Sequence, residues 1–120
     1  MADSKLTIEE RHVGDVTILV LTGEMLLDDG DLAFRARIHD LIERGRVKVV
    51  LDLGGLTYMD SSGVGMLAAK LKTLKEKGGD MRLLHLTRRS ETLLGMLKLL
   101  LVFETFDDEG MAVRSFARRL

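Results

Sequence analysis

The chain has 120 residues, the size of one domain, which is enough to bury a hydrophobic core without disulfides or bound metal. Its net charge of −1 predicts no general attraction to nucleic acid, and the absence of cysteine excludes disulfides, thiolate zinc sites and cysteine nucleophiles. The first sixty residues hold 7 Lys and Arg against 12 Asp and Glu (net −5), and the last sixty hold 11 against 7 (net +4). This asymmetry either steers a protein partner or reflects an ordinary solvated surface.

The sequence also bears on where the protein acts. The first ten residues, MADSKLTIEE, contain no apolar stretch of the kind that a secretory signal needs. No apolar run elsewhere approaches the roughly 18 residues that span a membrane. We therefore expect a cytoplasmic protein without membrane insertion, folded as a single domain over residues 1–120.

The first quarter of the chain predicts a hairpin followed by a helix. Leu6 to Arg11 and Val16 to Thr22 read as strands, and the second is almost wholly apolar, as is typical of a central strand. Gly23 should end it. The sequence DDGD at 28–31 offers caps for a helix that Gly45 ends. The apolar face of this helix consists of Phe34, Ile38, Leu41 and Ile42.

The middle of the chain, from 47 to 71, predicts a strand that feeds a helix. The strand opens with an apolar run rich in β-branched residues, Val47, Val49, Val50 and Leu51, and is expected to end near Asp52 and Leu53. Gly54 and Gly55 should break it before a short extended piece. The sequence DSSG at 60–63 then precedes a helix, whose apolar residues at helical spacing are Val64, Leu67, Ala68, Leu71 and Leu74. One carboxylate and two hydroxyls therefore lie at a strand-to-helix junction.

The last part of the chain predicts two strands that alternate with two helices. The strands are Met81 to Leu86 and Val102 to Phe106. Caps are available for both helices, Thr87 or Ser90 for the first and Asp107 or Asp108 for the second. The run Leu93 to Phe103 is apolar on nearly all sides, for which we favour deep burial; an exposed leucine patch that serves as an interface is the alternative.

The DSSG junction has two interpretations. Asp and Ser are favoured helix N-caps, because their oxygens accept hydrogen bonds from free backbone N–H groups, so capping alone is one. Two hydroxyls beside a carboxylate and before two glycines exceed what a cap needs. Residues 56–67, LTYMDSSGVGML, resemble the signature of STAS-domain anti-sigma-factor antagonists. In that family the partner anti-sigma kinase phosphorylates the serine immediately before the glycine, which by position is Ser62. Physical argument alone does not choose between Ser61 and Ser62, and Gly63 is expected to leave the hydroxyl accessible.

The resemblance implies a fold and a mechanism. The fold is α/β, a mixed sheet of four to five strands with about four helices packed mainly on one face. The function is that of a non-enzymatic switch without a cofactor, which binds an anti-sigma factor with serine kinase activity and is released on phosphorylation; a phosphatase would be a further partner. The expected partner-binding residues are Asp60, Ser61, Ser62, Gly63, Val64, Met66, Asp28 and Asp29. For the two aspartates of the 28–31 loop, capping the first helix is the alternative role.

Two other functions stay open: a STAS scaffold subunit of a signalling complex or membrane transporter that works without phosphorylation, and a nucleotide-binding STAS module. Other classes fit worse. The GVGMLA sequence at 63–68 matches a dinucleotide-binding pattern, but about ten residues separate it from the strand that it should follow directly. No nucleophile elbow is present, and His12, His39 and His85 lie in different elements without metal-ligand spacing. The sequence therefore predicts no catalytic residue and no metal site.

Overall fold

A computed structural model describes residues 5–26 and 29–117; the side chains of residues 29–31 are left undescribed. The chain forms one five-stranded sheet in the order β1-β2-β3-β4-β5, in which β1 runs antiparallel to β2 and all other neighbours are parallel. The elements in chain order are β1 (Leu6–Val13), β2 (Val16–Met25), α1 (Asp29–Glu43), β3 (Lys48–Met59), α2 (Ser61–Glu76), β4 (Asp80–Leu84), α3 (Arg88–Met96), β5 (Glu104–Phe106) and α4 (Glu109–Arg114), followed by a single 3₁₀ turn (Ser115–Ala117).

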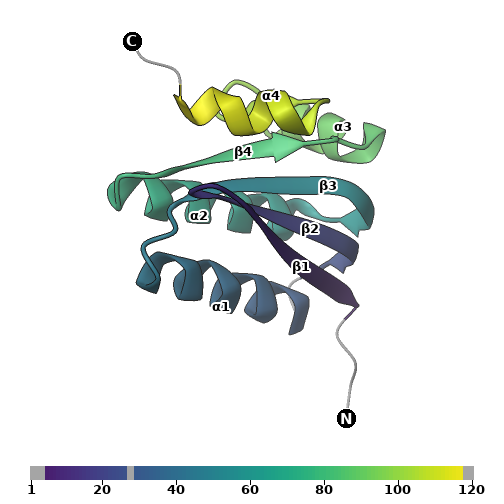
Figure 1. Cartoon of the computed structure of the whole chain (residues 1–120). Coiled ribbons are helices and arrows are strands. Elements are labelled where there is room, and N and C mark those ends of the chain that lie inside the picture. The colour runs from purple at the N-terminus through teal and green to yellow at the C-terminus, as the bar shows by residue number, and fades with distance from the viewer. Residues whose placement is uncertain (1–4, 27–28, 118–120) are drawn as a thin grey trace.

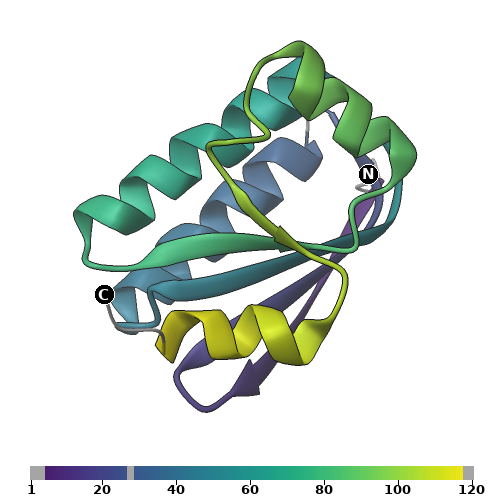
Figure 2. The ribbon, with the colours of Figure 1, turned by 90° about the horizontal axis from the view of Figure 1, so that it is seen from above.

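Helices cover both faces of the sheet, but unequally. Helices α1, α2 and α3 lie on one face, and α4 lies alone on the other (Figures 1 and 2). Two apolar clusters match these layers: the larger one holds the apolar faces of α1 and α2 together with Leu94 of α3, and the smaller one holds Ala112 of α4. The predicted fold class, a mixed α/β sheet with helices mainly on one face, is confirmed.

Burial on both faces explains the apolar runs of the two central strands. In β2, Leu19 and Leu21 pack under α1 and α2, whereas Ile18 packs under α4. In β3, Leu51 and Val50 divide between the two clusters in the same way. Successive side chains of a strand point to opposite faces, so a strand covered on both sides is apolar at nearly every position.

The prediction that glycines interrupt the central strands is wrong. Strand β3 continues through Gly54 and Gly55 to Met59, with a register shift against β2 at this point. A Cβ on Gly55 would lie 3.1 Å from the carbonyl oxygen of Leu21, so the small residue permits a close approach of the strands. Strand β2 likewise continues past Gly23 to Met25, which pairs with Met59. Both strands thus extend to the DSSG junction.

The burial favoured for the run from Leu93 to Phe103 is wrong for most of it. Helix α3 ends at Met96, and in this run only Leu94 and Phe103 are buried. The exposed large side chains are Met96 (73%), Leu97 (42%), Leu100 (37%), Leu101 (100%) and Val102 (46%). The alternative of an exposed apolar patch therefore describes this segment. None of the described helices is long and apolar enough to cross a membrane.

Candidate functional site

The junction between β3 and α2 is organised by Asp60. Its backbone is extended, and its Oδ1 accepts a hydrogen bond from the Gly63 amide at 3.0 Å, as an N-cap does. The same oxygen accepts a hydrogen bond from the Ser62 hydroxyl at 2.5 Å. These two donors, the Ser62 hydroxyl foremost, lower the pKa of Asp60, because they stabilise the carboxylate. An ionised Asp60 therefore holds both the first turn of α2 and the hydroxyl of Ser62.

The two serines of the motif have different surroundings. Ser61 is exposed at the first position of α2, whereas Ser62 is half-buried and donates to Asp60. The Ser62 hydroxyl gives its hydrogen to the carboxylate and keeps its oxygen lone pairs free. The sequence could not distinguish the two positions, because the difference lies in the hydrogen bond to Asp60.

Gly63 has a different role from the expected one. It is buried, and a Cβ there would lie 2.7 Å from Cγ of Met59 and 3.1 Å from the carbonyl oxygen of Met25. The missing side chain thus lets α2 pack closely against the ends of β2 and β3, on the side facing the core. Gly65, two residues further along α2, has no atom within 4 Å of the position that a Cβ would take.

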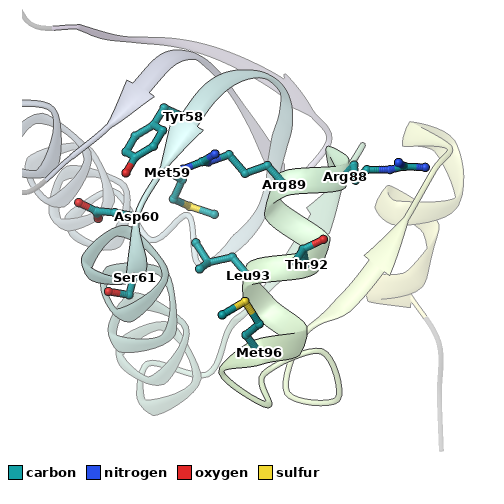
Figure 3. A pocket seen from close by; sticks show the side chains of 9 residues that line it. All are labelled: Tyr58, Met59, Asp60, Ser61, Arg88, Arg89, Thr92, Leu93 and Met96. Carbon is teal, nitrogen blue, oxygen red and sulfur yellow. The ribbon is translucent and has the colours of Figure 1, made fainter.

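A groove of about 710 Å³ opens beside the junction, between the start of α2 and α3 (Figure 3). Arg89 of α3 reaches across it, and its guanidinium lies 4.1 Å from the ring centroid of Tyr58 at the end of β3. This distance is that of a cation–π contact. The complete lining is Tyr58, Met59, Asp60, Ser61, Arg88, Arg89, Thr92, Leu93 and Met96.

Comparison with known proteins identifies the family of this chain. The STAS domain model matches residues 7–112. This chain belongs to the STAS domain family. An anti-sigma F factor antagonist of Paenibacillus polymyxa is 32% identical over 109 residues, which cover 90% of this chain and 92% of that protein.

Two solved structures share this STAS fold. The anti-sigma factor antagonist SpoIIAA in its unphosphorylated form superposes with a TM-score of 0.80 at 21% identity, covering 95% of this chain and 99% of that one. The Bacillus cell fate determinant SpoIIAA in the phosphorylated form gives a TM-score of 0.73 at 22% identity, covering 93% and 100%. At these identities the likeness establishes the fold alone.

Within this STAS domain, the residues predicted for partner binding fall into three groups. Asp60, Ser61 and Ser62 come together at the accessible start of α2. Gly63 and Val64 are buried and Met66 is half-buried against the core, so these three shape the turn from beneath. Asp28 lies outside the described residues, and the side chain of Asp29 is undescribed, so their role stays a prediction.

The sequence reasoning missed the contribution of α3. Arg89 and Leu93 form the far wall of the groove, although they lie about thirty residues beyond the motif. A signal was available: β3 and β4 are parallel neighbours, so the segments that follow them leave the sheet at the same edge. The Arg-Arg pair directly after Thr87 could have been placed beside the DSSG turn on that ground.

Proposed function

We propose that this STAS protein is a non-enzymatic anti-sigma-factor antagonist. It binds an anti-sigma factor that is also a serine kinase, and phosphorylation of Ser62 releases it. The observation that carries the proposal is the placement of Ser62, whose hydroxyl is bound to the N-cap Asp60 at the start of α2. Membership of the STAS family and similarity to a protein named as an antagonist support it.

Inside the domain, a phosphate on Ser62 meets opposing effects. It adds about −1.5 to −2 charges at neutral pH. The free N–H groups and dipole at the start of a helix favour an anion by about 0.3–1 kcal/mol. The carboxylate of Asp60, which now accepts the Ser62 hydroxyl, opposes it as a like charge. The net change in the free energy of unfolding should therefore be small.

At an interface the balance is different. A partner that packs over the turn without offering a cation would bury an unpaired dianion. An uncompensated buried charge costs about 3–5 kcal/mol. This corresponds to a loss of affinity of roughly a hundredfold to several thousandfold. Phosphorylation should thus change binding and leave the fold almost unchanged.

The test begins with the modification itself. The protein is incubated with the anti-sigma kinases of its source organism and ATP, and the site is located by intact mass and peptide mapping. Ser62→Ala should remove the phosphate, and Ser61→Ala, the matched control one residue away, should retain it. A phosphate that maps to Ser61 or elsewhere would show that the assignment is wrong.

The second arm measures binding and stability together. Ser62→Ala should bind the anti-sigma factor in the presence of ATP without being released, and Ser62→Asp should bind at least about a hundredfold more weakly than the unmodified protein. Both variants should melt near the wild type. If Ser62→Asp binds as tightly as the wild type, the switch is refuted and the scaffold function becomes the better explanation.

A further inference from the structure

The groove beside the junction is continuous with the proposed partner site. Asp60 and Ser61 belong to the motif and also line the groove, whose opposite wall is α3. Figure 3 shows Leu93 of α3 pointing toward Met59 at the end of β3, and Met96 further along α3 on the side of α2. A protein that covers the DSSG turn must therefore also cover the groove, or leave about 710 Å³ of partly apolar space in its interface.

The groove combines an apolar wall with a positioned cation. Leu93 and Met96 supply apolar surface, and Met59, which is 1% exposed, lines the groove beneath them. Arg89 is exposed, and its stacking on Tyr58 fixes one face of the guanidinium while its N–H edge stays available. Arg88 points away from the centre of the groove and adds a second positive charge at its edge. Within residues 5–26 and 29–117, neither arginine is in an ion pair.

An exposed apolar surface continues from the groove. Met96 lines the groove, and the segment that follows exposes Leu97, Leu100, Leu101 and Val102, with Leu101 fully accessible. Val102 in turn lines a second groove of about 450 Å³ along α2, which is flanked by Lys72 and Lys75. Contiguous exposed apolar surface with a polar rim is typical of interaction sites. We call the segment Met96–Val102 the α3 patch.

We propose that the anti-sigma partner docks on the groove and the α3 patch together, through an apolar ridge flanked by carboxylates, one of which pairs with Arg89. This inference rests on the proposed function and extends it, because it assigns partner choice to α3 rather than to the motif. Positive charge on both flanks of the patch, Arg89 at one end and Lys72 and Lys75 at the other, is complementary to an acidic partner.

The shape of this surface favours a protein over a lipid bilayer. Two grooves flank the patch, and a flat membrane surface would fill neither. A folded partner with protruding side chains can fill both grooves and pair with the lysines and Arg89.

The experiment compares the reversal of a positive charge in the groove with the same reversal on the opposite face of the sheet. Affinity for the anti-sigma factor is measured with the unphosphorylated wild type, with Arg89→Glu, and with Arg114→Glu as the matched control on the exposed side of α4. Reversal at a charged interface position should weaken binding by about tenfold or more and reduce its salt dependence. The control on the opposite face of the sheet should stay within about twofold of the wild type.

A second pair of variants tests the apolar part. Leu101 is fully exposed in the free protein, so Leu101→Ser leaves the core intact; Met111→Ser on α4 (55% exposed) is its control. If Leu101 is buried on binding, its loss should weaken affinity by about tenfold. Melting temperatures of all four variants near that of the wild type exclude unfolding as the cause.

The outcomes separate the two proposals. If Ser62→Asp abolishes binding while Arg89→Glu and Leu101→Ser bind normally, the antagonist function stands and the docking surface is refuted. If the wild type binds no anti-sigma factor, both are refuted. Co-sedimentation with vesicles of phosphatidylcholine and phosphatidylglycerol (about 7:3), lost in Arg89→Glu and Leu101→Ser, would identify the patch as a lipid-binding surface and overturn the proposal.

Discussion

Gly63 and Gly65 lie two residues apart in α2, yet alanine should affect them in opposite ways. Alanine is intrinsically favoured over glycine in a helix by about 0.5–1 kcal/mol. At Gly65 nothing lies within 4 Å of the added Cβ, so Gly65→Ala should stabilise the protein by about that amount. At Gly63 the Cβ would lie 3.1 Å from the backbone oxygen of Met25 and 2.7 Å from Cγ of Met59. The flexible methionine can move, but the carbonyl can yield only if the helix shifts.

Overpacking of this kind costs about 1–3 kcal/mol. Set against the helical preference, Gly63→Ala should be about 0–2.5 kcal/mol less stable than the wild type. The two variants should therefore differ by about 1–3 kcal/mol, or roughly 3–15 °C in melting temperature. Urea unfolding of both variants, with equal m values required, measures this difference. Equal stability, or a more stable Gly63→Ala, would show that Gly63 is not needed for the packing of α2 on the strands.

Two further predictions concern charged groups. The pKa of Asp60 is lowered in the folded protein, so its carboxylate contributes stability that is present above the unfolded pKa and lost as pH falls through the folded one. Urea unfolding measures the difference in the free energy of unfolding between the wild type and Asp60→Asn. This difference should shrink below about pH 4, and a constant difference from pH 7 to pH 3 would contradict the prediction. Arg82 is 7% exposed and pairs with Asp80 and Glu104. Arg82→Ala should cost about 1.5–3 kcal/mol in urea unfolding, and a loss within 0.5 kcal/mol, roughly the effect of a surface change, would contradict it.

Local chemistry made most element starts predictable from the sequence. Thr87 and Asp108 were each expected as one of two possible caps, and both cap their helices by accepting a backbone N–H, from Ser90 and Met111 respectively. Capping was one of the two interpretations of the DSSG motif, and Asp60 is the N-cap of α2. A cap depends on residues within one turn of each other, so a short stretch of sequence contains the information.

The errors arose where the outcome depends on distant segments. Whether Gly54 and Gly55 end a strand or allow a bulge is decided by the neighbouring strand β2, which approaches closely at this point. Most of the apolar run after Leu94 is exposed because none of the elements that the structure describes packs over it, and the composition of the run does not reveal this. The stacking of Arg89 on Tyr58 likewise joins two segments about thirty residues apart.

The two proposals together suggest why a small modification could control a large interface. The turn is held rigidly, by the bonds of Asp60 to Ser62 and the amide of Gly63, so a phosphate there changes the surface rather than the fold. Asp60, which accepts the Ser62 hydroxyl, also lines the groove that Arg89 enters, so a phosphate on Ser62 would add negative charge at the margin of the proposed docking surface. The phosphate would then repel the carboxylates that we assign to the partner. This repulsion requires no movement of the sheet, because charges at a partly desolvated surface are screened less than they are in bulk water.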